Sequence, residues 1–468
     1  MTINRLTGFD ASLLTLEAPS QPMTGGALFE LDTSTMPGGY SFENFRSTLR
    51  GRIAALPEFR MKLADSRLNL DMPAWVDDHD FDFDHHVGRV ELAPPGGRRE
   101  LSELVGHLVA QRLDRGRPLW DIRVIEGVST SDPSFSGPVA VLLRMHHVMA
   151  DGATALDIFS RLCANEADPP TPLVRDGVGT VGKRQLVLDG LLRFAARPWL
   201  LMTKVLPATI SGVVEARRRD VKPTMFTAPK TMFNGDVTEH RNVAYVQLEL
   251  RDVRAVKDKF GVTVNDVTAA LTAGAIRRFL LERDALPQTP LVAAMPISVH
   301  DPDRPGRNQL SSMDSSLCTD IADPALRVLA VSKANSAAKE HISTIGPTLL
   351  QDWMQCFPGL LPLILRLYRL SGQANRRPRY NLTFSNVRGP EQQTFLMGAS
   401  VKARYAYGPV FHGSGLIVVV MSLGGKLDVG LSACPDLVPD LWDVAEGFPA
   451  ALEELLHASA THTDASTT

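Results

Sequence analysis

Hydrophobic and polar positions along the chain follow two periods. Short apolar runs such as GGALFEL, LWDIRVIEG and PVAVLLRM are typical of strands. Between them, SFENFRSTLRGRIAAL and RELSELVGHLVAQRLD repeat apolar residues at helical spacing, and Ser41 is placed to cap the first of these helices with Glu43 in its first turn. GATALDIFSRLC predicts a further helix. The alternation predicts a mixed α/β protein.

The pattern changes after about Asn165. NEADPPTPLVRDGVGTVG has the composition of a linker, and a long helical stretch from about residue 184 to 220 follows, in which Pro198 and Pro207 predict interruptions. A second linker, VKPTMFTAPKTMFNGDVTEHR, leads to the strand VAYVQLEL. We therefore expect an N-terminal domain, a linker with an amphipathic helical segment and a C-terminal domain, over residues 1–165, 166–240 and 241–468.

The second half returns to the α/β style. DVRAVKDKFG predicts a helix capped by Asp252 and stopped by Gly261, and NDVTAALTAGAIRRFLLER predicts a helix from about Asn265. LVAAMPISV and YNLTFSNV are typical of strands, and GLIVVVMSLGGKLDVGLSA predicts a hairpin that turns at Gly424 and Gly425. The small, polar tail after His457 is expected to fray.

Composition narrows the class of protein. A chain of 468 residues suits two or three domains, and a formal net charge of -3 does not indicate a general nucleic-acid binder. The 4 cysteines lie far apart without C-x-x-C spacing, which argues against structural zinc and a disulfide framework and fits a reducing compartment. The first residues do not resemble a signal peptide, and the sequence has no apolar run of about 18 residues. We expect a cytoplasmic protein, with attachment to a lipid surface left open.

The most informative local pattern is HHVMADG, where a predicted strand hands over to a predicted helix. Neutral imidazole can take and return a proton near neutral pH, and the end of a strand can hold His146 or His147 rigidly beside a cleft. Asp151 can accept hydrogen bonds or pair with an arginine and so hold the turn, and Gly152 lets the chain reverse without a Cβ clash. The pattern suits one catalytic histidine with supporting residues.

Two other interpretations of this pattern stay open. Adjacent histidines on a strand point to opposite faces, so one metal ion can hardly bind both without a local bend. Buried histidines with satisfied hydrogen bonds are the second alternative. We predict that structural role for His85 and His86, a pair that is not followed by a strand-to-helix turn. For the pair in HHVMADG, local reasoning does not decide between function and structure.

Read together, several motifs resemble known proteins. HHVMADG resembles the HHxxxDG motif of the coenzyme-A-dependent acyltransferase superfamily, which includes chloramphenicol acetyltransferase and peptide-synthetase condensation domains. Nearly the whole chain is similar to the bacterial wax ester synthase/acyl-CoA:diacylglycerol acyltransferases. The similar segments follow in the same order: LTGFDASLLTLEAPSQPMTGGALFEL, DFDFDHHV, LDRGRPLWDIRVIEG, TVNDVTAALTAGAIRRFL, MPISVH with GRNQL, and SNVRGP.

The resemblance implies a fold of two chloramphenicol acetyltransferase-like domains, each a mixed sheet packed with helices, with a channel between them. It implies that His147 is the general base, that His146 supports it, and that Asp151 pairs with an arginine and has a structural role. The base deprotonates an acceptor hydroxyl, which attacks the thioester carbon of acyl-CoA directly. Acyl-CoA is then a substrate, and no cofactor or metal is implied.

The resemblance also implies roles for residues outside the histidine motif. Asn265 has a supporting or oxyanion-stabilising role, although helix capping explains the Asn-Asp pair equally well from local sequence. Two positions depart from the family pattern, since His300 stands where arginine is usual and Arg388 where proline is usual. The residues expected to bind substrate are Pro118, Leu119, Trp120, Asp266, Asn308 and Asn386, with packing as the alternative for Trp120 and its neighbours.

The expected reaction is acyl transfer to diacylglycerol, which makes triacylglycerol and belongs to lipid and glycerol metabolism. Wax ester synthesis with a long-chain alcohol, a catalytically weak lipid-binding protein and a metal enzyme are the alternatives. LLRFAARPWLLMTKVL and LLQDWMQCFPGLLPLILRLYRL combine apolar and basic residues and suit a membrane or lipid-droplet surface. Packing on the body or on a partner subunit explains them equally well. The oligomeric state stays open.

Overall fold

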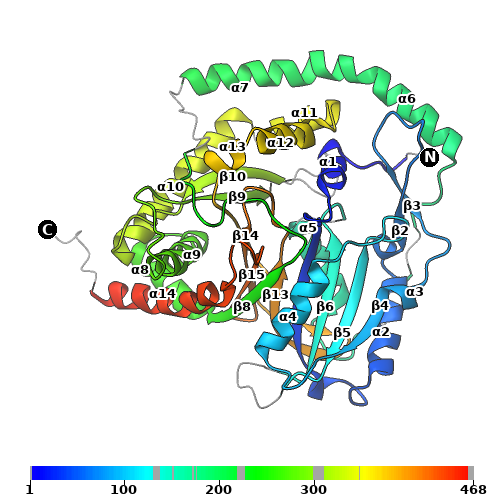
Figure 1. The fold of residues 1–468 in the computed structure, drawn as a ribbon. Helices are drawn as coiled ribbons and strands as arrows, with labels where there is room; N and C mark the ends of the chain where they lie inside the picture. The colour runs from blue at the N-terminus through cyan, green and yellow to red at the C-terminus, as the bar shows by residue number, and fades with distance from the viewer. Residues whose placement is uncertain are drawn as a thin grey trace.

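The computed structural model describes residues 3–129, 137–149, 152–170, 173–174, 177–218, 227–298, 310–346 and 348–461. Two mixed sheets lie side by side, each with helices packed against it (Figure 1). The first sheet has the strand order β4 (Val87–Glu91), β5 (Trp120–Glu126), β6 (Val139–His146), β1 (Thr24–Asp32), β13 (Ala399–Tyr407), β12 (Phe395–Leu396) and β7 (Cys163–Ala164). The second has the order β10 (Leu310–Ser316), β9 (Val292–Ser298), β11 (Leu382–Val387), β14 (Leu416–Leu423), β15 (Lys426–Ala433) and β8 (Asn242–Glu249).

A short pair, β2 (Met61–Ala64) and β3 (Ala74–Asp77), lies apart from these sheets. The helices of the first half are α1 (Gly8–Leu16), η1 (Thr33–Thr35), α2 (Phe42–Ala54), η2 (Pro57–Arg60), α3 (Phe83–His86), α4 (Arg98–Val109) and α5 (Gly152–Leu162). A long helical segment follows as α6 (Lys183–Leu200), η3 (Leu201–Val205) and α7 (Leu206–Arg218). The second half contains α8 (Leu250–Phe260), α9 (Val264–Leu281), α10 (Pro324–Ile345), α11 (Leu349–Cys356), α12 (Leu360–Leu370), α13 (Gln373–Arg376) and α14 (Leu441–Thr461).

The first sheet is completed by the C-terminal half of the chain. β1 pairs antiparallel with β6 on one side and with β13 on the other, with Thr24 opposite His146 and Gly26 opposite Tyr407. The sequence pattern does not predict β13, because Lys402 and Arg404 interrupt its apolar positions, yet the Arg404 side chain is buried. The first sheet is therefore not built from residues 1–165 alone.

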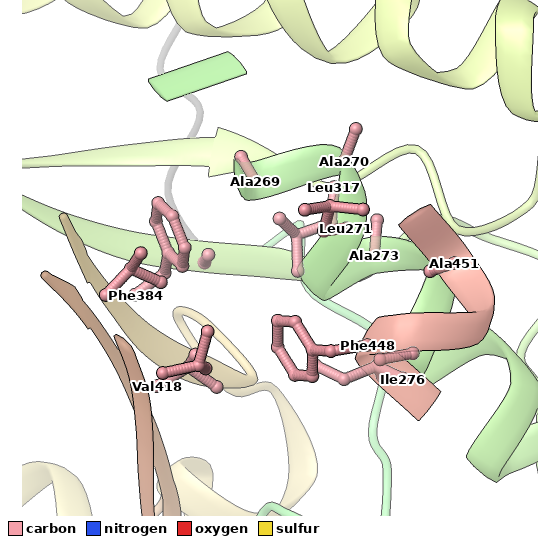
Figure 2. Packing of buried hydrophobic residues seen from close by; sticks show 14 of the residues in the cluster. Ala269, Ala270, Leu271, Ala273, Ile276, Leu317, Phe384, Val418, Phe448 and Ala451 are labelled. Carbon is pink, nitrogen blue, oxygen red and sulfur yellow. The ribbon is translucent and has the colours of Figure 1, made fainter. Parts of the chain in front are cut away.

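The hydrophobic core of the second half forms between the second sheet and the helices α9 and α14. Figure 2 shows Phe384 and Val418 on the strand side, with Ile276 of α9 and Phe448 of α14 packed close to them. Gly274 allows the two helices to approach closely, since a Cβ atom there would lie 2.9 Å from the Cβ of Ala451.

Local signals predict most of these elements, including the hairpin at Gly424 and Gly425, whose φ angles are 53° and 86°. Three local predictions are wrong. α8 begins at Leu250, so Asp252 lies in its first turn and is not its cap, although Gly261 ends the helix with φ 65° as expected. α14 continues to Thr461, so the first four residues of the tail are helical and do not fray, and the rest of the tail lies outside the described residues.

The third wrong prediction concerns the prolines of the long helix. Pro198 lies inside α6 and Pro207 at the second position of α7, so the chain remains helical at both prolines and the α-helix is interrupted only between them. The π-helical turn η3 lies between the two prolines, so the α-helical hydrogen-bonding pattern changes there while the chain stays helical.

Candidate active site

The histidine pair lies at the end of a central strand whose backbone is held on both sides. The N–H of His146, the last residue of β6, donates to the carbonyl of Leu119 at 2.9 Å. The N–H of His147 donates to the carbonyl of Met23 at 2.7 Å, and the N–H of Met149 closes a turn on the carbonyl of His146 at 2.9 Å. His146 is 0% exposed, whereas His147 is half-buried, so the two imidazoles meet different surroundings.

The environment of His146 keeps its imidazole neutral. Its Nδ1 accepts the N–H of Val148 at 3.0 Å, which places the ring proton on Nε2. Nε2 lies 3.6 Å from Oε1 of the buried Glu17, beyond hydrogen-bond length. Burial lowers the pKa of His146 to about 3, and the charges of Arg115 and His147 act in the same direction. His146 and Glu17 therefore do not form an ion pair near neutral pH.

Sequence reasoning missed Glu17 and Arg115. Oε2 of Glu17 accepts hydrogen bonds from Nε and Nη2 of Arg115 at 2.9 and 2.6 Å, and Nη2 of Arg115 also reaches the carbonyl of Leu14 at 2.6 Å. Glu17 lies in the matched opening segment LTLEAPSQPM, but nothing in its local pattern marks it as a neighbour of a residue 129 positions later.

Residues from the second half hold the segment that supports His147. Arg241 donates to the carbonyl of Ser20 at 2.8 Å, and the N–H of His412 donates to Oε1 of Gln21 at 3.0 Å. This segment continues to Met23, whose carbonyl accepts the N–H of His147. The candidate base therefore stands where the two halves of the chain meet. Sequence reasoning also missed these contacts, because they join residues more than 200 positions apart.

Several expected site residues lie outside the described part of the chain. These are Asp151 and Asn308, together with His300, which departs from the family pattern. Gly152 is the first residue of α5, as expected for the residue at which the turn becomes a helix.

Asn265 and Asn386 come together in the second half. Nδ2 of Asn386 on β11 lies 3.3 Å from Oδ1 of Asn265 and 3.2 Å from Oγ1 of Thr268, both on α9. The two asparagines line a cavity of about 600 Å³, whose described lining does not include His146 or His147. The structure thus pairs the two asparagines with each other and places the histidine pair at a separate position.

The mouth of this cavity is basic. Its lining includes four basic side chains against two acidic ones: Arg254, Lys257, Lys339, Arg388, Asp258 and Glu391. Lys257 pairs with Asp258 at 2.6 Å, and Arg254 and Arg388 share Glu391 at 3.3 and 3.0 Å. Arg388 is thus an exposed member of this rim. Apolar side chains, among them Met295 and Phe384, line other parts of the cavity.

Within the described part of the chain, Asp266, next to Asn265, hydrogen-bonds to the cap residue of α9 and to residues of α10. It forms a capping box with Thr263, whose N–H and Oγ1 lie 3.0 and 2.7 Å from Oδ2, and it accepts from Asn335 at 2.8 Å and Ser332 at 3.0 Å. Burial raises the pKa of Asp266, but the hydrogen bonds from Asn335 and Thr263 outweigh it and hold the pKa below the usual value. These contacts support a structural role in place of the expected substrate contact.

Pro118, Leu119 and Trp120 are buried, which leaves them no surface for substrate. Nε1 of Trp120 donates to the carbonyl of Phe59 at 2.7 Å, and its ring stacks on His86 with centroids 4.5 Å apart. His86 also bonds the carbonyl of Trp120 through Nδ1 at 2.7 Å, so it has the structural role predicted for it. This motif supports the site from the core, through the Leu119 carbonyl that accepts the N–H of His146.

Comparison with known families decides the classification. Residues 6–268 match the wax ester synthase/diacylglycerol acyltransferase catalytic domain, and residues 307–456 match the C-terminal domain of the same family. The chain belongs to this family. The resemblance read from the sequence is therefore confirmed, and so is its assignment as an acyltransferase.

Relatives of this family member cover almost its whole length. A Mycobacterium tuberculosis protein provisionally named a diacylglycerol O-acyltransferase is 47% identical, over 98% of this chain and 91% of its own. A second M. tuberculosis protein with such a name is 32% identical, over 98% of this chain and 97% of its own.

Solved structures agree with the fold of this family member. The wax ester synthase/diacylglycerol acyltransferase from Marinobacter aquaeolei VT8 aligns with a TM-score of 0.72 at 25% identity, over 98% of this chain and 100% of that one. The first condensation domain of the calcium-dependent antibiotic synthetase aligns with a TM-score of 0.59 at 14% identity, over 98% of both chains. The second likeness concerns the fold alone. The expected two-domain mixed α/β architecture is confirmed.

Two structural findings complete the description of this wax ester synthase/diacylglycerol acyltransferase family member. In the described ranges, no three His, Cys, Asp or Glu side chains gather in a way that could hold a metal ion. None of the helices within those ranges is long and apolar enough to cross a membrane.

Proposed function

We propose that this family member is an O-acyltransferase that moves a long-chain acyl group from acyl-CoA to the free hydroxyl of diacylglycerol and so makes triacylglycerol. The observation that carries the proposal is the half-buried His147 at the junction of the two halves, beside a neutral His146 that is fixed in the core. The names of the relatives support diacylglycerol as acceptor. Cytoplasmic localisation, with attachment to a membrane or lipid-droplet surface, belongs to the same proposal.

In the proposed reaction, neutral His147 takes the proton of the acceptor hydroxyl as its oxygen attacks the thioester carbonyl carbon. The tetrahedral intermediate then collapses: the C–S bond breaks, the ester is released, and the coenzyme A thiolate takes the proton from His147. His146 positions the neighbouring base through its fixed backbone, and Asp151 and Gly152 shape the turn. Asn265, held by Asn386, supports the substrate or stabilises the oxyanion.

The basic mouth of the large cavity supports acyl-CoA as the donor. The nucleotide end of coenzyme A carries phosphates, which Lys and Arg side chains bind by charge-assisted hydrogen bonds. In the proposal Arg254, Lys257 and Lys339, which line the cavity, bind these phosphates, and the apolar lining suits the less polar parts of the donor. We infer that acyl-CoA binds along this cavity, with its nucleotide at the basic side chains and its thioester end toward Asn265 and Asn386.

Release of free thiol from palmitoyl-CoA, with purified protein and either diacylglycerol or hexadecanol, tests the reaction. We expect His147→Ala to lower the rate about 10²–10⁴-fold. His85→Ala, which replaces an exposed histidine, is the matched control and should keep the parent rate. Turnover by His147→Ala at the parent rate would show that His147 is not the general base.

Two alternatives lead to different results in the same assay. A wax ester synthase would release thiol faster with hexadecanol than with diacylglycerol. A lipid-binding protein that keeps the fold would release thiol at the same rate with and without either acceptor, and its lipid affinity would survive the loss of His147.

The donor site is tested by comparing two donors. A Lys257→Ala/Lys339→Ala variant should have a higher KM for palmitoyl-CoA, whereas its KM for palmitoyl-pantetheine, which lacks the nucleotide, should equal that of the parent. Equal KM values of variant and parent for palmitoyl-CoA would exclude the cavity mouth as the nucleotide site.

A further inference from the structure

The long helix formed by α6, η3 and α7, here called the outer helix (residues 183–218), crosses the top of the molecule in Figure 1. Its inward stripe is marked by the buried residues Leu186, Gly190, Val205 and Gly212. Most of its other large apolar side chains are exposed, at spacings of about one helical turn: Leu188, Leu191, Leu192, Phe194, Trp199, Met202, Ile210, Val213 and Val214.

Ion pairs attach the outer helix to the body of the protein. Nη2 of Arg197 contacts Oδ1 of the buried Asp71 at 2.6 Å, and Nε of the buried Arg5 contacts Oδ2 of Asp189 at 2.7 Å. A surface helix of a soluble protein normally buries its apolar stripe and exposes its charges. The outer helix instead uses charged groups for attachment and leaves apolar groups in solvent.

A second apolar segment lies beside the outer helix. None of the eleven residues of α12 (LLPLILRLYRL) is buried. α11, which precedes it, bonds to the outer helix through Nε1 of Trp353 and Oγ1 of Thr209 at 3.0 Å. Figure 1 shows α11 and α12 next to each other below the arch of the outer helix.

α1 connects this apolar region to the candidate active site. α1 packs on the α11–α12 corner, where Oγ of Ser12 donates to the carbonyl of Pro358 at 2.7 Å. α1 ends at Leu16, and the next residue is Glu17, whose carboxylate lies 3.6 Å from His146. One helix therefore connects the exposed apolar segment to the histidine pair.

The net positive charge of the outer helix and α12 indicates which kind of partner binds them. The outer helix carries seven Lys or Arg residues and two acidic ones, in a chain whose formal net charge is -3. α12 adds Arg366 and Arg369 and has no acidic residue. A second copy of the chain on this face would bring two basic helices together, which is unfavourable. An anionic lipid surface complements the positive charge and also accepts the apolar side chains.

We propose that the outer helix and α12 form a docking surface for an anionic lipid interface, with the exposed apolar side chains inserted shallowly and the exposed basic residues, such as Lys183, Lys204 and Arg366, at the headgroups. The benefit to catalysis, delivery of a membrane-borne acceptor, rests on the proposed function. Lipid binding itself is measured without acyl-CoA, so it succeeds or fails independently of acyl transfer.

Co-sedimentation of the full chain with phosphatidylcholine vesicles, with and without phosphatidylglycerol, tests the proposal. We expect binding to require phosphatidylglycerol and to weaken with added salt. The variant Leu192→Glu/Trp199→Glu, at side chains 72% and 75% exposed, should partition at least about tenfold more weakly. The matched control Leu326→Glu replaces an exposed leucine of α10 and should bind like the parent.

Tryptophan fluorescence reports insertion directly. Trp199 is exposed, whereas the other tryptophans are buried or half-buried. We expect a blue shift of the emission when the parent meets anionic vesicles, and no such shift in Trp199→Phe, which keeps an apolar side chain.

Three outcomes would overturn the proposal. The first is that the parent does not bind anionic vesicles, and the second is that the double variant binds them as well as the parent does. The third is that sedimentation of the protein alone shows a dimer and that the double variant is monomeric, which would make this face a subunit interface. Thiol release with a water-soluble short-chain alcohol, measured without vesicles, separates the two proposals. Unchanged release by the double variant locates its defect in docking, whereas no release by the parent would count against acyl transfer alone.

Discussion

The buried imidazole of His146 makes folding sensitive to acid. The unfolded chain takes up a proton at this residue below a pKa of 6.5, whereas the native protein keeps it neutral down to a pKa of about 3. Between these values the unfolded state binds more protons, so the free energy of unfolding decreases as the pH falls. At about pH 5 the loss from His146 alone is about 2 kcal/mol, from about 1.4 kcal/mol per pKa unit.

His146→Asn tests this prediction. Asparagine keeps an acceptor near the position of Nδ1 for the N–H of Val148 but does not titrate. With an unfolding entropy of about 2.1 cal/mol/K per residue, a loss of about 2 kcal/mol in the free energy of unfolding lowers the Tm by about 2 °C if the whole chain unfolds together. The decrease is about 4 °C if each half unfolds by itself. We expect the Tm of the parent to fall by this much more than that of the variant between pH 7 and pH 5. His85→Asn is the exposed control, and equal Tm losses in parent and His146→Asn would refute the assignment of a neutral, buried His146.

Three further predictions concern other residues. Burial raises the pKa of Asp428 to about 7, so from about pH 4 to 7 the native state binds more protons than the unfolded state. The contribution of Asp428 to the free energy of unfolding therefore falls as the pH rises. Asp428→Asn should remove this fall, and the Tm difference between variant and parent should grow toward pH 7. Asp266→Ala removes the capping box and two further hydrogen bonds, which should lower the free energy of unfolding by about 2–4 kcal/mol in urea titrations, whereas the exposed Glu446→Ala should change it by less than about 0.5 kcal/mol. Asn265→Ala should lower kcat about 10²-fold with little change in KM if its amide stabilises the oxyanion, and a changed KM at constant kcat would assign it to binding.

Local sequence signals predict what depends on neighbouring residues. The hairpin follows from Gly424 and Gly425, which adopt positive φ, and α2 begins where Ser41 accepts the N–H of Asn44 at 3.1 Å. β6 and α5, at the two ends of HHVMADG, belong to the same class, because each is defined by its own periodicity.

Local sequence signals do not predict which distant segments of the chain pair with each other. β13 joins the first sheet next to β1, although about 370 positions separate them in the chain, and its buried Arg404 conceals the strand pattern. The environment of His146 depends on Glu17 in the same way. No local hydrophobic pattern predicts that Glu17, the residue after α1, lies beside His146 at the end of β6.

The proposed mechanism gives the two histidines of the motif different roles. In the proposed mechanism His147 is the base, and the pKa of about 3 that burial gives His146 supports this choice, because so weak a base takes up little proton between pH 5 and 8. The effect of His146 on the reaction must then come through position, from the backbone that joins it to His147. His146→Asn should therefore lower kcat while leaving the pH dependence of kcat/KM unchanged in shape. A shifted pH profile in this variant would mean that His146 takes part in proton transfer, and that its burial does not keep it neutral during turnover.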